Sequence, residues 1–298
     1  MAQAPLKMNT RESLQKLGYA VVPAVLSEDE IRTAKSWFHE WLDSVNIPQS
    51  MRTHGIFKHH EVGHQKHAWY VRTRPKVREV FAREVWDTSP GNLVVSFDGS
   101  CYIPGGREVR RGDSVSWTHT DQSPTQKGRQ CVQGFVALTS NKTRSLVVYE
   151  GTHLEHQAYF STHPAKDPSK RFQKIDSAYL HAPEMRARRK VVEAEAGSLV
   201  LWDSRTFHQN QYGVQDEGER LVQYVCYMPR DGAGNTDAQT KKRLKYFEDR
   251  RTTSHWPYPI SVNGKQPQRY GNDDLLIDYS SLPRPDLHSL MNDIVKLI

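Results

Sequence analysis

Short apolar runs bounded by turn residues occupy the middle of the chain, and this pattern predicts β-strands. Each run is rich in branched and aromatic residues and is too short for an ordinary helix. The clearest runs are Leu93–Phe97, Gly134–Thr139, Ser145–Tyr149, Leu199–Trp202 and Leu221–Tyr227. The polar stretch Gln209–Glu219 contains two glycines and is typical of a hairpin loop. We therefore expect Arg220 on a strand beside the one that ends at His208.

Helical periodicity appears on both sides of these runs. Ser27 and Glu30 have the spacing of a capping box, and apolar residues then recur with helical period as far as Val45. Further helices are predicted over Pro75–Trp86, Gln239–Arg251 and about Asp286–Ile298. An apolar face on such helices favours packing against a sheet.

Two histidines and one aspartate are the candidate chemistry. His119 and Asp121 are two residues apart, so on a strand both side chains point the same way. His208 follows the apolar run Leu199–Trp202, and a second strand brought alongside the first would add it to the pair. Two imidazoles and a carboxylate hold ferrous iron on one face and leave the other face open. Because the chain has 14 histidines, a strand-end His–Asp pair that only bonds a turn is the alternative.

These motifs, in this order, resemble the phytanoyl-CoA dioxygenase family of Fe(II)- and 2-oxoglutarate-dependent oxygenases. Gly18–Glu30 is similar to the family's opening strand and helix start, and His119 with Asp121 to its metal pair. Gly134–Thr139 and Ser145–His153 resemble its central strands and the turn after them, although that turn reads Glu-Gly-Thr-His here. Gly197–His208 and Arg220 match the distal histidine and the arginine that anchors the co-substrate.

The resemblance implies a site and a reaction. His119, Asp121 and His208 would bind Fe(II), and Arg220 would pair with the far carboxylate of 2-oxoglutarate. The Thr152 hydroxyl would add a hydrogen bond to that co-substrate. With O2, such a site hydroxylates a substrate C–H bond and releases succinate and CO2. An aspartate at position 121 favours hydroxylation over halogenation, because a small residue there would admit a halide.

The resemblance also implies a fold, mainly β with flanking helices: a double-stranded β-helix, or jelly-roll barrel, whose closure removes sheet edges. Residues 1–298 are expected to form a single domain, with the barrel core at about 90–230. Residues 231–298 lie outside the family's shared motifs. We expect them to pack on the barrel exterior or to form an oligomer contact.

The composition of the chain restricts the classes of partner that it could bind but does not identify a substrate. The net charge of +7 and basic clusters near Arg186 and Lys241 would suit an anionic partner such as nucleic acid, although solvated surface charge explains them as well. No stretch is apolar enough to cross a bilayer, and the N-terminus lacks the apolar core of a secretion signal. Three scattered cysteines are expected as free thiols in a reducing compartment. We expect an intracellular, cytoplasmic protein.

Three functions remain open at this stage. The first is hydroxylation of a small or medium organic molecule, and the second is the same chemistry on a protein or nucleic acid. The third is a cupin-like barrel that binds a metal without oxidation. The dense histidines between His54 and His67 lack the spacing of a regular metal site, so a loop over the substrate is the favoured interpretation and a second metal site the alternative.

Overall fold

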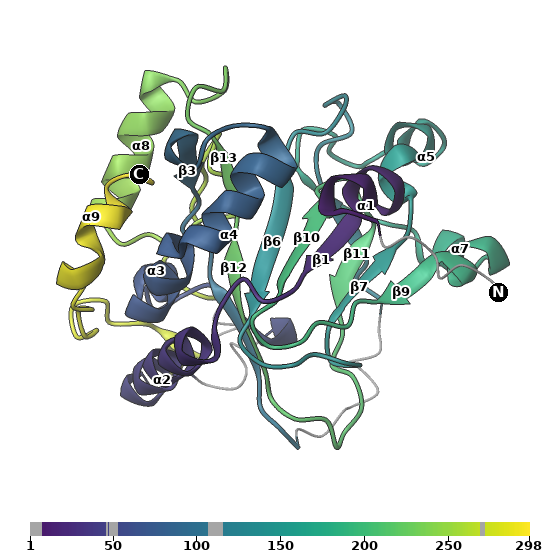
Figure 1. Ribbon diagram of the computed structural model, residues 1–298. Helices are drawn as coiled ribbons and strands as arrows, with labels where there is room; N and C mark the ends of the chain where they lie inside the picture. The colour runs from purple at the N-terminus through teal and green to yellow at the C-terminus, as the bar shows by residue number, and fades with distance from the viewer. Residues whose placement is uncertain (1–7, 46, 48–52, 107–115, 269–271) are drawn as a thin grey trace, which may run out of the picture.

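Two antiparallel sheets stacked face to face form the centre of the molecule (Figure 1). The computed structural model describes residues 8–45, 47, 53–106, 116–268 and 272–298. The larger sheet has the order β1 (Tyr19–Val22), β10 (Leu199–Asp203), β6 (Val132–Ala137), β12 (Arg220–Val225), β4 (Ser100–Ile103) and β2 (Ile56–Phe57). The smaller sheet has the order β8 (Phe172–Lys174), β5 (His119–Asp121), β11 (His208–Asn210), β7 (Leu146–Tyr149) and β9 (Arg189–Val191). A separate pair joins β13 (Tyr227–Pro229) to β3 (Leu93–Val95).

The central strands are buried along their whole length because both faces of the larger sheet are covered. On β10, Leu199 and Leu201 belong to the core under the helices, whereas Val200 and Trp202 belong to the core between the sheets. This division follows from the two-residue repeat of a strand. Arg220 occupies the same face of β12 as Val222, which lies between the sheets, so its side chain enters the space that the two sheets enclose.

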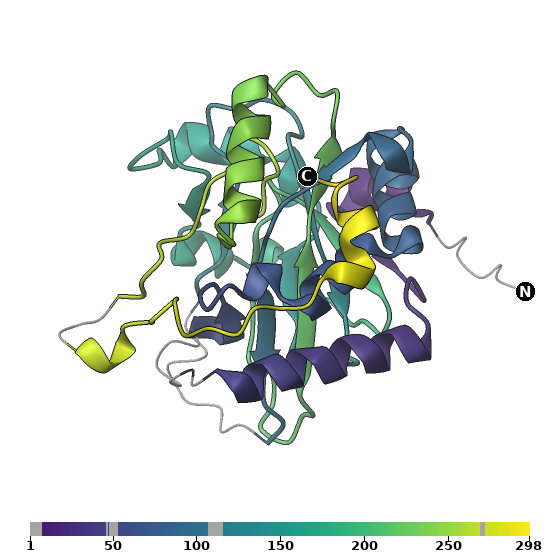
Figure 2. The same ribbon diagram turned by 90° about the vertical axis from the view of Figure 1, so that its left-hand side faces the viewer.

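The helices lie outside the sheets. Those of the N-terminal half cover the outer face of the larger sheet (Figures 1 and 2). Their bounds are α1 (Thr10–Leu17), α2 (Glu28–Ser44), α3 (Lys66–Thr73) and α4 (Pro75–Glu79), the last continuing as a π-helical segment to Trp86. The excursion between β7 and β9 contains α5 (His156–Thr162), α6 (Ser177–Leu180) and α7 (Pro183–Arg188), and the C-terminal part contains α8 (Asp237–Glu248) and α9 (Met291–Ile294).

The helix start predicted from Ser27 and Glu30 agrees with the structure. Ser27 accepts a hydrogen bond from the Glu30 amide and the Glu30 side chain accepts one from the Ser27 amide, which completes the capping box of α2. The last helix is shorter than predicted, because the turn His288–Leu290 is 3-10 helical and α9 is short.

The mainly β jelly-roll fold with flanking helices is confirmed, with two differences of detail. The sheets form an open sandwich and no closed barrel, so β1, β2, β8 and β9 remain at sheet edges among the described residues. The predicted neighbour of the Arg220 strand is also wrong. After Trp202 the chain leaves the larger sheet, and His208 begins β11 in the smaller one, whereas β12 pairs with β6 and β4. The stretch 211–219 therefore crosses between sheets.

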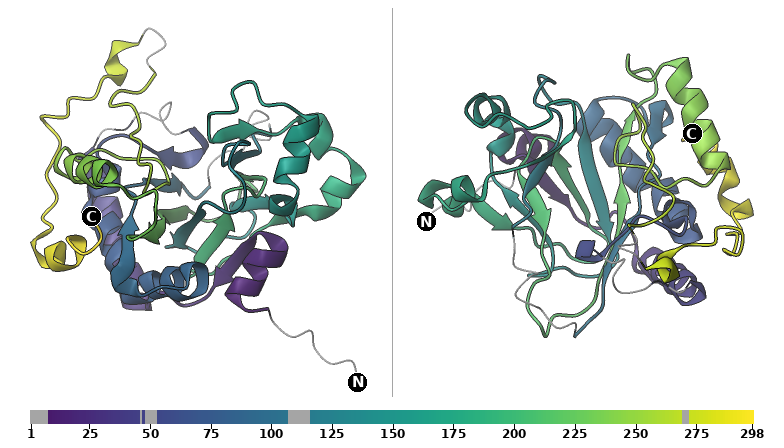
Figure 3. Two further views of the ribbon diagram at one scale, coloured as in Figure 1. Left: turned by 90° about the horizontal axis from the view of Figure 1, so that it is seen from above. Right: turned by 180° about the vertical axis from the view of Figure 1, so that it is seen from behind.

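Among the described residues after 230, the helices α8 and α9 lie on the side of the molecule that carries α3 and α4 (Figures 1 and 3). Leu290, Ile294 and Leu297 belong to the same core as the N-terminal helices, so this extension is an integral part of the fold. One stretch of it, Thr252–Asn263, reaches inward to the sheets. Within the described residues, no helix is both long and apolar enough to cross a bilayer.

Candidate metal centre

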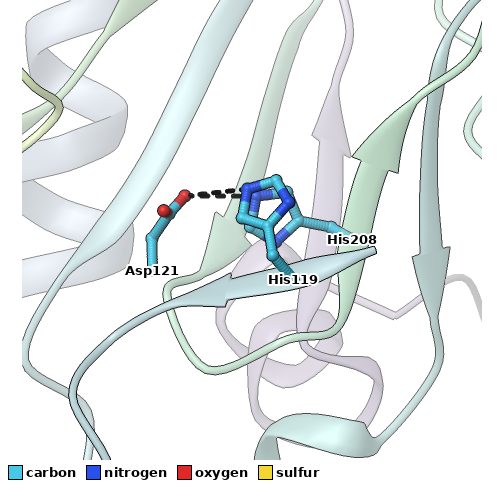
Figure 4. A group of neighbouring side chains, drawn as sticks. All are labelled: His119, Asp121 and His208. Atoms are coloured by element: carbon cyan, nitrogen blue, oxygen red, sulfur yellow. Dashed lines mark ion pairs between the residues drawn. The ribbon is translucent and has the colours of Figure 1, made fainter. Parts of the chain in front are cut away.

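His119, Asp121 and His208 converge between the two sheets, as their spacing predicts (Figure 4). His208 lies directly opposite His119 in the β11–β5 register, and Asp121 is two residues further along β5. The Nε2 atoms of His119 and His208 lie 3.5 Å and 3.3 Å from Asp121 Oδ2. All three side chains are buried, and one ligand atom of each lies within 4.8 Å of the others. This geometry suits a single divalent metal ion.

Backbone carbonyls fix the orientation of both imidazoles. His119 Nδ1 lies 3.1 Å from the carbonyl of Trp117, and His208 Nδ1 lies 2.8 Å from the carbonyl of Thr206. A carbonyl only accepts, so each ring carries its proton on Nδ1 and presents the lone pair of Nε2. Neutral imidazoles held in this way are the form that binds metals. Burial and the neighbouring His119 lower the pKa of His208, which favours this neutral form.

The carboxylate of Asp121 stays ionised in its buried position. Burial alone would raise its pKa, but His119, His208 and His255 together hold the pKa of Asp121 well below its usual range. Gln133 on β6 donates a hydrogen bond of 3.0 Å to Asp121 Oδ2. His255 Nε2 lies 3.6 Å from the same oxygen. The carboxylate of Asp121 thus accepts a hydrogen bond from Gln133 and faces the His255 ring.

Arg220 is fully buried close to this group, and its charge is not compensated by an acid. It donates 3.2 Å to Cys101 Sγ and 3.1 Å to Asn210 Oδ1. Asn210 is two residues after His208 on β11 and so shares its face. Burial raises the pKa of the Cys101 thiol, which Arg220 opposes, so the thiol is neutral. Within the described part of the chain, Arg220 has no carboxylate partner and its Nε has no acceptor.

Thr152 lies outside the metal group, and its hydroxyl is hydrogen-bonded to backbone groups. Its hydroxyl donates to the Tyr149 carbonyl at 2.7 Å and accepts from the Phe207 amide at 3.0 Å. It does not line the cavity beside the metal group. The hydroxyl therefore ties the turn after β7 to the residue that precedes His208, and a contact with a co-substrate stays a prediction without support from its position.

A cavity opens beside the three metal-binding candidates. Its apolar wall includes Trp117, Phe172 and Trp202. Phe172, which is 53% exposed, and Trp117 both stack on His119, with ring centroids 4.5 Å and 4.9 Å from that of its imidazole. The polar lining of the cavity includes Asp98, Asn210, Tyr224 and His255. Because Phe172 belongs to the excursion between β7 and β9, that excursion contributes to the lining of the site.

Two of the clustered histidines between His54 and His67 pack inside the protein. His64 and His67 are buried among aromatic rings, and burial lowers the pKa of each to about 3. His54 stacks on Trp117 at 4.1 Å, near the mouth of the cavity. The only group of metal-binding side chains found in the described residues is His119, Asp121 and His208.

Sequence reasoning missed the residues that support the metal group. Gln133 directly precedes a predicted strand and Asn210 falls in the predicted hairpin loop, and neither carries a motif. Asp98 and His255 form an ion pair from a loop and from the C-terminal extension. Burial opposes a charge on His255, but Asp98 and Asp121 outweigh it and raise the pKa of His255 to about 9. The His-Trp-Pro sequence at 255–257 gave no signal of this role, since its partner lies far away in the chain.

The basic clusters are partly structural. Arg243 is buried and donates to Asn235 Oδ1, and Lys245 pairs with Asp249 within α8. Arg188 pairs with Glu155. The three cysteines are free and buried, in agreement with the prediction.

The chain is similar in sequence or in fold to several known proteins. The curated Ava biosynthesis cluster protein O of Aspergillus versicolor is 30% identical over 225 residues, which cover 72% of this chain and 69% of that protein. Among solved structures, the epimerase SnoN in complex with Fe3+, alpha ketoglutarate and nogalamycin RO has a TM-score of 0.51 at 18% identity, covering 74% of this chain and 82% of that one. The hypothetical protein JW0805 from Escherichia coli has a TM-score of 0.60 at 14% identity, covering 83% and 75%.

These two structures share the fold at low sequence identity. The family model of phytanoyl-CoA dioxygenase (PhyH) matches residues 14–211, a span that contains His119, Asp121 and His208. Together with the curated relative, this match shows that the chain belongs to the phytanoyl-CoA dioxygenase family.

Proposed function

We propose that the protein is an Fe(II)- and 2-oxoglutarate-dependent oxygenase that hydroxylates a small organic molecule. The observation that carries the proposal is the convergence of His119, Asp121 and His208, with both imidazoles held as neutral Nε2 ligands. Two histidines and one carboxylate occupy one face of an iron ion and leave the other positions for co-substrate and O2. Bound iron with 2-oxoglutarate and O2 supplies the oxidation, and succinate and CO2 are its by-products.

Arg220 is the proposed anchor of 2-oxoglutarate. A buried guanidinium without an acidic partner is costly, and an anion entering beside it would remove that cost. The far carboxylate of 2-oxoglutarate fits this requirement, because guanidinium and carboxylate pair through two parallel hydrogen bonds. Asn210 holds one Nη of Arg220 at 3.1 Å and so directs the fork. Its position two residues from His208 connects the anchor to the metal face.

The remaining residues of the cavity orient the substrate and exclude water. Trp117 and Phe172 stack on His119 and supply apolar surface. Tyr224 is a neutral phenol, because burial raises its pKa. A cavity lined by both aromatic and polar side chains suits a compact organic substrate better than a polymer. The epimerase SnoN, whose structure is a complex with nogalamycin RO, lends support to the small-molecule class.

Anaerobic titration with Fe(II) and then 2-oxoglutarate tests the proposal. The expected result is a visible metal-to-ligand charge-transfer band in the wild type. Folded protein that binds iron but shows no band on addition of 2-oxoglutarate would exclude the co-substrate, leaving the non-oxidative metal-binding barrel. Once the band is found, succinate release identifies substrates, and 18O2 labelling of the product distinguishes hydroxylation from epimerisation or ring closure. Salt-sensitive retention on nucleic acid would favour a macromolecular substrate instead.

A further inference from the structure

The C-terminal extension brings a histidine to the metal group through a defined set of contacts. The Thr253 amide donates to the Phe97 carbonyl at 3.0 Å, and the Phe97 amide donates to Thr253 Oγ1 at 2.9 Å. Thr252 Oγ1 accepts from the Gly63 amide at 3.2 Å. The Ser254 amide donates to the Ser261 carbonyl at 2.9 Å, and Thr253 forms an isolated β-bridge with Val262. The stretch therefore folds back on itself and is held by its own backbone. His255 follows directly and faces the cavity.

Each ring nitrogen of His255 faces a carboxylate. Nδ1 bonds Asp98 Oδ2, and Nε2 lies 3.6 Å from Asp121 Oδ2. Asp98 is itself held, because its Oδ1 accepts from the Gly99 amide at 2.7 Å and its carbonyl accepts from the buried Arg72. The ring is therefore anchored on one side and directed at Asp121 on the other. His255 also lies beyond the family match, which ends at residue 211.

We propose that His255 is a positioning residue for Asp121, with Asp98 as its anchor. Gln133 approaches Asp121 Oδ2 from β6 and His255 approaches it from the extension, so the carboxylate is restrained from two sides. Groups of this kind, one step removed from the metal, orient its ligands and typically change metal affinity by about 10- to 100-fold. The inference rests on the proposed function, because it takes Asp121 as a metal ligand. It adds that the extension completes the metal site.

Metal affinity is the measurement that separates positioning from packing. Binding of Co(II) alone is followed by calorimetry and by its visible spectrum in the wild type, His255→Ala and His255→Gln. We expect His255→Ala to weaken Co(II) binding about tenfold and to change the spectrum. His255→Gln keeps an N–H that can reach Asp121, so it should recover part of the affinity. Ser261→Ala is the matched control, because it alters the same stretch without lining the cavity, and it should bind Co(II) as the wild type does.

Two results would overturn the inference. One is an unchanged Co(II) affinity and spectrum in His255→Ala, and the other is an equal loss in His255→Ala and His255→Gln. If His255→Ala does not fold, His255→Leu retains the volume without the N–H, and the same tenfold loss is expected. The wild type distinguishes the two proposals. Co(II) binding without a charge-transfer band for Fe(II) and 2-oxoglutarate removes the oxygenase function alone, whereas absence of metal binding removes both.

Discussion

The cavity has two halves that are built by different means. The half formed by β5 and β11 lies within the family match and is fixed by strand register, with His119 directly opposite His208. The half formed by Thr252–Asn263 lies outside that match and is irregular, and its position depends on side chains such as Thr253 and Asp98. The difference indicates that the chemistry is set by the shared strands, whereas the extension adjusts the ligand and the shape of the cavity.

The largest expected effect is on the strand half. Asp121→Ala should weaken Fe(II) binding by more than about 100-fold and abolish the charge-transfer band, because a ligand is lost outright. Asp293→Ala, which removes a carboxylate of α9, is the control and should leave iron affinity unchanged. Full iron affinity in Asp121→Ala would show that the two histidines bind metal without the acid. The strand half of the cavity would then not owe its chemistry to Asp121.

Two buried arginines test whether the cavity contains a place for an anion. Arg220→Ala should weaken 2-oxoglutarate binding by about 100-fold with little loss of thermal stability, since it removes an uncompensated charge. Arg144 is also buried but bonds the carbonyls of Pro104, Tyr212 and Gly218. Arg144→Ala should instead lower the free energy of unfolding by about 3 kcal/mol. Denaturant unfolding and 2-oxoglutarate titration of both variants decide, and equal effects of the two on 2-oxoglutarate would make Arg220 structural.

A fall in pH should destabilise the folded conformation of the extension before it destabilises the strands. His64 Nε2 bonds the Arg251 carbonyl, next to Thr252, and burial lowers the pKa of His64 to about 3. The unfolded chain binds a proton below pH 6.5 and the folded one only near pH 3, so this stability is complete above pH 6.5 and is lost as the pH falls. At pH 5 the loss is about 2 kcal/mol at most.

Hydrogen exchange at pH 7 and pH 5 measures this difference. Amides of residues 251–263 should gain exchange rate more than those of β10. His64→Gln, which cannot be charged, should reduce the gain. A uniform change over both halves would mean that they unfold as one unit.

The smallest expected effect concerns the apolar wall. Phe172→Ala exposes the face of His119 that the ring covers, and about a threefold rise in succinate formation without substrate is expected, because water enters more easily. Leu154→Ala, another exposed apolar residue, should not change that rate. Unchanged succinate formation in Phe172→Ala would remove the shielding role.

The sequence predicts those parts of the molecule that depend on local spacing. The two-residue repeat correctly places His119 and Asp121 on one face, and the capping box correctly begins α2 at Glu28. Pairing of distant strands is not local, so the sequence pattern predicts the wrong neighbour for β12 and a closed barrel that the structure does not have. His255 could not be found at all, because its meaning depends on Asp98, which the fold brings to it.

The position of His119 directly opposite His208 has a consequence for how long the protein survives in a cell. A metal ion held by both would act as a removable cross-link between β5 and β11, two strands that are short and far apart in the chain. Any ligand that binds only the folded state raises stability with its concentration. A chelator should therefore shorten the survival of the chain under protease as well as stop turnover. The iron supply of a cell would then set how much folded protein is present, before it sets how fast that protein works.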